Sequence, residues 1–489
     1  MRNQVPINNK CGDLPWPTPH STATCWCAAH LGKRVILVEK DAVLGGATAW
    51  SGGWLWAPRN PLARRAGIIE DIEQPRTYLR NELGEHYRSE LVDAFLQHCP
   101  DMVAFFEQYT ALQFVDGNGI PDMHGDTPGA ASGGHQVIAA PYDGREVLDL
   151  LPRLRKTMRE TSFMGMPIMA GADLAAFLNM TRSPGALLHV IRRFTTHLYH
   201  LARYGRAMHL VNGVALVARL ARSAQDLGVQ MMVSTPAQRL IIEDGPVAWA
   251  PVSKVPHADG SVGHFPHIID RGKPGIIGVL QNGKRFVNEA GGYYDYVDAM
   301  LEAIPEDQQA CSWLICDHLF QRRYGLGFAR PAPVPLWPHI RNGYLKRGHS
   351  LEALAQACGI DPFGLVATVD EFNQHARRGE DPLFGRGSTA FNRRSGDAQH
   401  SGPNPCVAPI EHGPFYAVKV QPGCFGTFAG LRTDGHARVL DGAGQPIPGL
   451  YAAGTDMASP MGGHYPSGGI NIGPALTFGY IAGRHAATV

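Results

Sequence analysis

The sequence predicts an α/β fold in which a nucleotide-binding domain is assembled from two separated parts of the chain. A short apolar run from Lys33 ends in Glu39, a pattern typical of a buried parallel strand. A glycine-rich stretch, residues 45–53, follows at once. A second glycine-rich stretch, residues 462–473, lies far along the chain and leads into an apolar helix. Together these observations indicate a discontinuous Rossmann-like domain with another domain inserted between its parts.

Composition limits the class of protein. With 489 residues the chain is too long for a single hydrophobic core, so more than one structural unit is expected. The 44 Lys and Arg residues balance 43 Asp and Glu residues, which gives no electrostatic reason to expect a nucleic-acid partner. No apolar run reaches membrane-spanning length, and the N-terminus lacks the apolar region of a secretory signal. The nine cysteines form no CxxC pair, so we expect no metal site, reduced thiols and a cytoplasmic location.

The first half of the chain alternates helical and irregular patterns. A helix stopping at Gly32 precedes the first strand. The stretch from residue 44 to residue 60 contains too many glycines to be a regular element, by this interpretation. Residues 74–108 are predicted to be helical, and residues 116–144, rich in Gly, Pro and Asp, are predicted to form a loop.

Residues 186–227 are predicted to be helical and basic. Six arginines lie among their apolar residues: Arg192, Arg193, Arg203, Arg206, Arg219 and Arg222. A basic amphipathic helix can lie on a membrane surface, so peripheral membrane contact is kept open. The alternative, which we favour here, is the solvated face of an ordinary domain helix.

The rest of the chain returns to strands. Residues 228–243 resemble two strands split at Pro236, and residues 249–394 mix strands and helices without repeats. The last part reads as a strand, a loop and a helix that begins near Gly473.

Acidic and glycine residues at these positions suit a flat dinucleotide cofactor. An acid that closes a parallel strand, here Glu39, can hold the adenosine ribose through its hydroxyls. Glycines let the backbone approach such a cofactor closely. Gly468 and Gly469 precede a helix, whose N-terminus stabilises the negative charge of a reduced flavin.

Several motifs carry a family resemblance. They are Val38-Glu39-Lys40, residues 45–53, Trp56–Asn60, Gly283–Tyr293, Gly413–Ala417, Gly449–Gly454 and Tyr465–Ala475. In this order the chain resembles the fumarate reductase/succinate dehydrogenase flavoprotein superfamily, and within it the FAD-dependent 3-ketosteroid dehydrogenases. The resemblance implies an α/β, Rossmann-like FAD-binding domain in two parts, residues 1–248 (with a helical excursion at about 74–227) and 405–489. An inserted α+β substrate domain would span residues 249–404.

The resemblance also implies a cofactor and a reaction. FAD would be held by Glu39, Lys40, Gly46, Thr48, Ser51, Gly52, Gly53, Gly454, Asp456, Gly468 and Ile470. The Tyr465 hydroxyl and the Gly469 N–H would donate hydrogen bonds to a ketone oxygen, and Tyr293 would remove the α-proton. The enzyme would dehydrogenate a 3-ketosteroid or similar cyclic ketone, preferably at the 1,2-position, and pass electrons to a separate acceptor. Trp54, Trp56 and Trp249 are candidates for flat walls of the substrate site.

Three departures from the family pattern keep alternatives open. The GxGxxG loop expected about 20 residues before Glu39 is replaced by a segment with three prolines, and Glu243 runs directly into substrate-domain sequence. Both features would suit a truncated flavoprotein that no longer binds FAD well. Met123 stands where the family has a second catalytic tyrosine.

Two other reactions of the superfamily are weighed. Tyr465 with Ser467 also resembles the 3-ketosteroid 4(5α)-dehydrogenases. A fumarate-reductase-type reductase of a small unsaturated acid would need a cationic clamp, for which Arg285 and His464 are the candidates.

Overall fold

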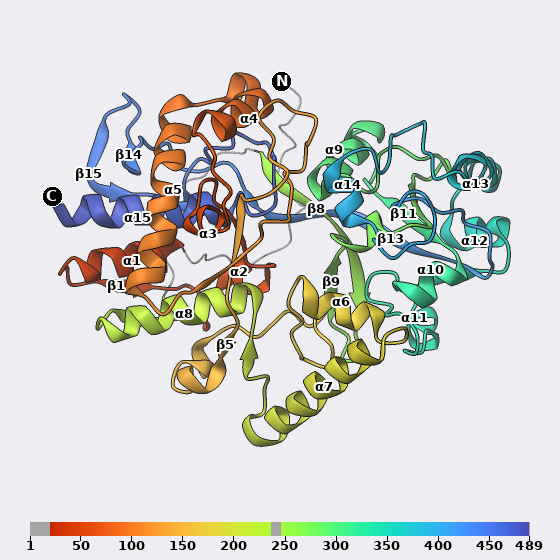
Figure 1. Ribbon diagram of the computed structural model, residues 1–489, viewed down its shortest axis with the longest axis horizontal. Coiled ribbons are helices and arrows are strands. Elements are labelled where there is room, and N and C mark those ends of the chain that lie inside the picture. The colour runs from red at the N-terminus through yellow and green to blue at the C-terminus, as the bar shows by residue number, and fades with distance from the viewer. Residues whose placement is uncertain (1–19, 236–245, 489) are drawn as a thin grey trace. The chain divides into compact units, whose positions relative to one another are not determined.

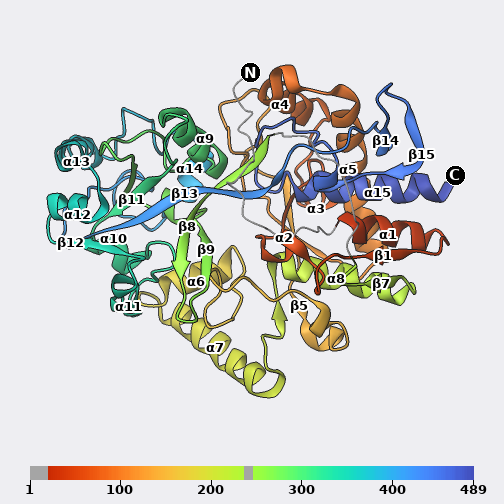
Figure 2. The ribbon, with the colours of Figure 1, turned by 180° about the vertical axis from the view of Figure 1, so that it is seen from behind.

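The computed structural model describes residues 20–235 and 246–488 (Figures 1 and 2). The chain divides into two compact units, one formed by the chain up to Ala248 together with Phe425 onward, the other by Trp249–Cys424. The inserted unit starts at the predicted residue 249 but extends past residue 404. The reason is strand β13 (Phe415–Thr427), which pairs with β11 (Ser312–Cys316) inside the inserted unit.

The strand predicted before Glu39 is present, but the prediction that it is buried is wrong, because Ile36 and Val38 are exposed and only Leu37 points into the core. Strand β1 (Ile36–Val38) pairs in parallel with β7 (Gln230–Met232), and the Glu39 N–H donates to the Met232 carbonyl at 2.8 Å. The predicted second strand after Pro236 and the junction at Glu243 lie outside the described residues. The same holds for residues 1–19, which include the three prolines of the segment found in place of the GxGxxG loop, residues 11–24; its last five residues begin helix α1 (His20–His30).

Helices from both ends of the sequence share one core in the first unit. Helix α1 (His20–His30) packs on α15 (Ile472–Thr488), and both contact neighbouring helices, α8 (Asn212–Asp226) and α5 (Ser89–Tyr109) respectively (Figures 1 and 2). A Cβ atom on Gly483 would lie 2.5 Å from the Cys27 Cβ, so α15 approaches α1 this closely because residue 483 is glycine. The predicted discontinuous α/β domain is therefore confirmed.

Two segments predicted to be irregular contain regular structure. Helix α2 (Gly46–Trp50) lies within the first glycine-rich stretch and strand β2 (Trp54–Trp56) directly follows it, both inside residues 44–60, which were predicted to be irregular. Strand β2 pairs antiparallel with β4 (Gln136–Ala139), which also pairs with β3 (Phe114–Asp116). Leu55 and Trp56 of β2 and all four residues of β4 are buried, so packing overrides the local glycine content.

The helical excursion is interrupted. Helices α3 (Pro61–Arg65), α4 (Glu73–Leu83) and α5 are followed by α6 (Ala172–Asn179), α7 (Pro184–Tyr204) and α8. The helix predicted over residues 186–227 is split because Gly205, with φ of 69°, ends α7 and strand β6 (His209–Leu210) follows. The remaining strands of this unit are β5 (Tyr142–Asp143), β14 (Arg438–Leu440) and β15 (Pro446–Tyr451).

The second unit has the α+β organisation predicted for it. Its six-stranded sheet has the order β10-β11-β13-β8-β9, with β12 paired to β13. The further strands are β8 (Val247–Pro256), β9 (Val262–Pro266), β10 (Ile276–Val279) and β12 (Lys346–Gly348). The helices are α9 (Tyr293–Ala303), α10 (His318–Arg323), α11 (Trp337–Arg341), α12 (Leu351–Cys358), α13 (Pro362–Ala376) and α14 (Ala390–Ser395). Residues of β10 and β11 form a buried core with α12 and α13.

In the described part of the chain, no helix is both long and apolar enough to cross a bilayer.

Candidate active site

Glu39 lies where a dinucleotide-binding fold needs a hydrogen-bond acceptor. Its side chain is buried directly after β1, and its Oε1 accepts from the Asp41 N–H at 2.7 Å. Burial raises the pKa of this carboxyl, because the charged form loses water. A desolvated acceptor at this strand end fits the hydroxyls of a ribose. Lys40 beside it is exposed to solvent.

The first glycine-rich stretch is held against the start of α8. The Ser51 hydroxyl donates to the Thr48 carbonyl at 2.8 Å and accepts from the Gly53 N–H at 3.0 Å. Gly53 has φ of 72°, and a Cβ on it would lie 2.5 Å from the Asn212 carbonyl carbon. Gly53 is thus needed for packing within the fold.

Gly46 and Gly52, the other two predicted cofactor glycines of this stretch, differ in exposure. Gly46 begins α2 and is buried. Gly52 is exposed, and among the described residues a Cβ on it would meet only the Trp54 side chain, at 3.5 Å, which leaves room for close approach by a flat group.

The second glycine-rich stretch is anchored by residues from distant parts of the first unit. The Pro466 carbonyl accepts from the Tyr78 hydroxyl at 2.6 Å and from the Met123 N–H at 3.2 Å. The buried Ser467 hydroxyl accepts from Gln136 Nε2 at 3.2 Å. These bonds fix the backbone on either side of Tyr465 and Gly468. Met123, which replaces the expected tyrosine, therefore contacts this loop through its backbone.

Gly469 connects the two glycine-rich stretches. Its carbonyl accepts from the Trp56 N–H at 3.1 Å, and Trp56 ends the strand that follows Gly53. Gly469 has φ of 95°, and a Cβ there would lie 2.6 Å from the Trp56 nitrogen. The structure thus brings the two stretches together on β2, with Ile470 buried next to them.

Tyr465 is buried next to another aromatic ring. The Tyr465 side chain is buried, its hydroxyl accepts from Asn471 Nδ2 at 3.4 Å, and its ring meets the Phe428 ring edge-on. Burial lowers the pKa of the adjacent His464, whose ring lies 5.5 Å from that of His86, so this imidazole is neutral at pH 7.

Gly454 and Asp456, predicted to contact the cofactor, form the short 3-10 turn Gly454–Asp456. The Asp456 carbonyl accepts from the Leu431 N–H at 2.8 Å, and Asp456 itself is exposed.

A chain of buried, hydrogen-bonded polar side chains, called the relay below, starts at Trp56 of β2 and was not predicted from the sequence. Trp56 Nε1 donates to Asp122 Oδ1 at 2.8 Å, and His135 lies between Asp122 Oδ2 (2.9 Å) and Glu70 Oε1 (2.6 Å). Burial alone would lower the pKa of His135, but the two carboxylates raise it to about 10. Trp56 is fully buried and stacked on Phe95, so it is a structural residue rather than a wall of the substrate site. No local pattern marks Asp122 and His135, whose meeting depends on strand pairing.

In the second unit, Tyr293 is the first residue of α9 and is half-buried. The Gly292 N–H just before it donates to Asp295 Oδ2 at 3.1 Å, which caps the helix. Arg271 Nη1 donates to the Glu289 carbonyl at 2.9 Å and so holds the preceding segment.

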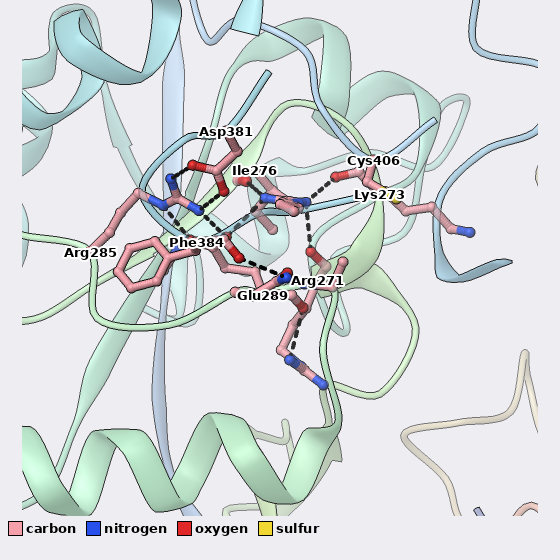
Figure 3. A network of polar contacts seen from close by, with 12 residues as sticks. Arg271, Lys273, Ile276, Arg285, Glu289, Asp381, Phe384 and Cys406 are labelled. Atoms are coloured by element: carbon pink, nitrogen blue, oxygen red, sulfur yellow. Dashed lines mark hydrogen bonds and ion pairs between the residues drawn. The ribbon is translucent and has the colours of Figure 1, made fainter. Parts of the chain in front are cut away.

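Arg285 is fully engaged in a buried network (Figure 3). Its guanidinium bonds Glu289 through Nε (2.8 Å) and Nη2 (2.7 Å), and Asp381 through Nη1 and Nη2 (both 2.8 Å). Arg386 Nη1 adds a bond to Glu289 Oε2 at 3.1 Å. The Arg285 side chain is only 2% exposed, so it cannot also bind the carboxylate of a substrate.

Strand β1 pairs in parallel with β7 and is followed by the buried Glu39, and the two glycine-rich stretches meet at β2. These features are typical of a dinucleotide-binding protein. A family model described as an FAD binding domain matches residues 22–248 and 246–472. The 4-oxocyclohex-2-ene-1-carboxylate 5-dehydrogenase of Sinomonas cyclohexanicum is 34% identical, over 94% of this chain and 90% of that protein. The chain therefore belongs to this FAD-binding family and is an FAD-dependent oxidoreductase acting on CH–CH groups.

Steroid enzymes are also similar. The 3-oxosteroid 1-dehydrogenase of Mycobacterium tuberculosis is 28% identical over 94% of this chain and 95% of that protein. The solved 3-ketosteroid delta1-dehydrogenase of Sterolibacterium denitrificans, in complex with 1,4-androstadiene-3,17-dione, has a TM-score of 0.87 at 28% identity and covers 96% of this chain and 98% of that one. This chain of the fumarate reductase/succinate dehydrogenase superfamily is thus similar both to dehydrogenases of cyclohexanone carboxylates and to dehydrogenases of 3-ketosteroids.

Proposed function

We propose that this enzyme dehydrogenates a cyclic ketone at the carbon–carbon bond next to the carbonyl. The observation that carries the proposal is the state of the two groups that could clamp a dicarboxylate. Arg285 is saturated by two buried carboxylates, and His464 is held neutral by burial. A dicarboxylate needs cations to offset the burial of its charge, whereas a ketone needs only neutral donors.

Neutral donors for a ketone oxygen are present beside the second glycine-rich stretch. The Tyr465 hydroxyl and the Gly469 N–H donate to that oxygen and stabilise the enolate as its charge develops. Their positions are set by Tyr78, Gln136 and Trp56, so little reorganisation is needed during the reaction.

Tyr293 removes the proton from the α-carbon. A free tyrosine hydroxyl has a pKa of about 10, so this role requires surroundings that favour the phenolate. Tyr293 stands at the N-terminus of α9, where the helix dipole favours negative charge.

The cofactor residues proposed from the sequence remain our assignment for FAD. Glu39 holds the ribose, Gly46 to Gly53 line the flavin, and Gly468 to Ile470 approach it from the start of α15. When bound, FAD supplies the hydride acceptor at N5 of its ring system.

For the substrate we propose a 3-ketosteroid, with the double bond at the 1,2-position. The alternative 4(5α) reaction was weighed because Ser467 neighbours Tyr465, but the Ser467 hydroxyl is fully buried and bonded to Gln136. A 4-oxocyclohexanecarboxylate is the second candidate, because relatives that are 34% and 33% identical carry names of that activity.

A side-by-side turnover assay tests the proposal. With added FAD and an artificial electron acceptor, the protein is given a 3-ketosteroid, 4-oxocyclohexanecarboxylate or succinate, and the products are identified by mass and NMR spectroscopy. We expect a two-hydrogen loss from the steroid, with the new double bond at the 1,2-position, and no reaction with succinate. Turnover of the cyclohexane acid alone would replace the steroid but keep the cyclic ketone. Turnover of succinate without either ketone would refute the proposal.

A further inference from the structure

Helix α7 is exposed along almost its whole length. Of its 21 residues, His197 is the one with a buried side chain, whereas most residues of α8 are buried. Figures 1 and 2 show α7 beside α6 and apart from the packed helices α1, α8 and α15 of its unit. Burial in a core therefore does not explain the apolar residues of α7.

The apolar residues of α7 form one exposed stripe, which we call the α7 stripe. Its members are Leu187, Leu188, Ile191, Leu198 and Tyr199. At 100° per residue they fall within an arc of about 120° on the helix. Leu188 is 68% exposed, Tyr199 62% and Ile191 50%. Contiguous apolar surface of this kind marks an interaction site.

The opposite side of α7 faces its own unit. His197 Nε2 lies 3.0 Å from the Met164 carbonyl, and Arg193 is paired with Asp173. At the border of the α7 stripe, the Phe194 ring packs on Phe163. The orientation of the helix is therefore fixed by these contacts, and the α7 stripe points outward.

The charges near the α7 stripe are positive. No Asp or Glu occurs between Pro184 and Tyr204, while Arg192 and Arg203 are exposed along one border of the stripe. A cavity of about 560 Å³ lies at the C-terminal end of α7. Its lining includes three basic residues, Arg155, Lys156 and Arg206, and apolar side chains such as Leu148. Arg155 is paired with Asp41, whereas Lys156 is exposed.

We propose that α7 docks this enzyme on an anionic membrane surface. The α7 stripe enters the boundary between headgroups and acyl chains, and Arg192 and Arg203 lie at the level of the phosphates. Charge complementarity favours this occupant over a second copy of the chain. Two copies meeting through their α7 stripes would bring arginines together, with no acidic residue of either helix to pair with them.

Vesicle co-sedimentation of the full-length protein tests the proposal. We expect binding to vesicles of phosphatidylglycerol and phosphatidylcholine, weaker binding to phosphatidylcholine alone, and release as salt is raised. Replacing Leu188 and Ile191 together by Glu should reduce binding tenfold or more, by roughly the transfer free energy of two leucine-sized side chains. The double substitution R192Q/R203Q should lower affinity for anionic vesicles about 30-fold, at about 1 kcal/mol per arginine.

Control variants distinguish docking through α7 from nonspecific hydrophobic binding and from unfolding. Ile69 and Phe363 are 90% and 87% exposed but lie outside α7, so I69E and F363E should bind vesicles as the wild type does. Far-UV circular dichroism and turnover of a water-soluble ketone should be unchanged in L188E/I191E. Undiminished vesicle binding by L188E/I191E would overturn the proposal. A second result would also overturn the proposal. In it, light scattering shows the wild type as a dimer and L188E/I191E as a monomer, and the wild type does not bind anionic vesicles.

Discussion

Replacing Arg285 by methionine is expected to destabilise the second unit strongly. The arginine is the cation shared by Glu289 and Asp381, whose side chains are 0% and 2% exposed. Methionine can still pack on the Phe384 ring that the guanidinium now covers, so the change removes charge more than volume. It leaves two carboxylates buried with Arg386 as the nearest compensating cation.

The size of the loss follows from these contacts. Removing one partner of a buried ion pair costs about 3–5 kcal/mol, because the remaining charge stays desolvated. Arg386, with its 3.1 Å bond to Glu289, offsets part of this, so we expect about 3 kcal/mol.

The loss should also depend on pH. Burial disfavours ionisation of both acids, but Arg285 holds the pKa of Glu289 and of Asp381 below the ordinary value. In the wild type this stabilisation is present above about pH 4 and is lost as pH falls further. In R285M the acids can be protonated at higher pH, so its deficit should shrink in acid.

Urea unfolding followed by tryptophan fluorescence, together with hydrogen exchange of β10, measures the effect. Exchange of the β10 amides should become about 100-fold faster, as about 3 kcal/mol implies. The control is R377M, which breaks the exposed pair between Arg377 and Glu411 and should cost less than about 1 kcal/mol. Equal losses in R285M and R377M would show that the buried network does not carry the stability assigned to it.

Four further predictions concern the site. Y293F should lower turnover of a 3-ketosteroid by about 10²-fold or more while FAD content is unchanged, and wild-type turnover would make Tyr293 a packing residue. Y465F should lower kcat/KM by about 3 kcal/mol, or roughly 100-fold, in the same assay, and a loss confined to FAD binding would contradict its role toward the ketone. Without a GxGxxG loop, FAD should be lost on dialysis unless supplied in excess, as absorbance would show, and adding a strand with such a loop before Cys27 should tighten binding. The pKa of His135 is about 6.5 in an unfolded chain and is raised to about 10 in the folded protein. The stability that protonated His135 gives the fold should therefore be complete below about pH 6.5 and be lost as pH rises through 10. The melting temperature of H135Q should lack this pH dependence.

Local patterns predicted elements near both ends of the first unit. The small and apolar residues after Gly473 form α15, which is buried from Ile472 to Gly483. The apolar run before Glu39 forms a parallel strand, but Leu37 alone of its three residues is buried, because β1 pairs with one strand, β7, among the described residues. Strand β2 was missed because its three residues directly follow Gly52 and Gly53 and its partner β4 lies far along the sequence. The end of the inserted unit was missed for a similar reason, since β13 runs on past residue 404 to complete the sheet.

The contacts proposed for FAD and the substrate stay predictions, but the structure gives two of the predicted glycines a packing reason. Gly53 and Gly469 were named from the sequence, and the structure shows backbone atoms at distances that leave no room for a side chain at either. Tyr78, Gln136 and the relay of Asp122 and His135 could not be predicted, because hydrogen bonds between distant segments leave no periodic signal in a single sequence.

The division of the chain also orders events during synthesis on the ribosome. Trp249–Cys424 is one continuous segment with its own sheet and core, so it can fold as soon as it has emerged. The first unit cannot close until α15 has been made, because α1 packs on that helix and β2 bonds to Gly469 just before it. The apolar surfaces of the first unit therefore stay exposed while the whole inserted unit is translated. Chaperone demand and aggregation during expression should accordingly depend on the first unit, and slowing translation after residue 424 should lower the yield more than slowing it before residue 249.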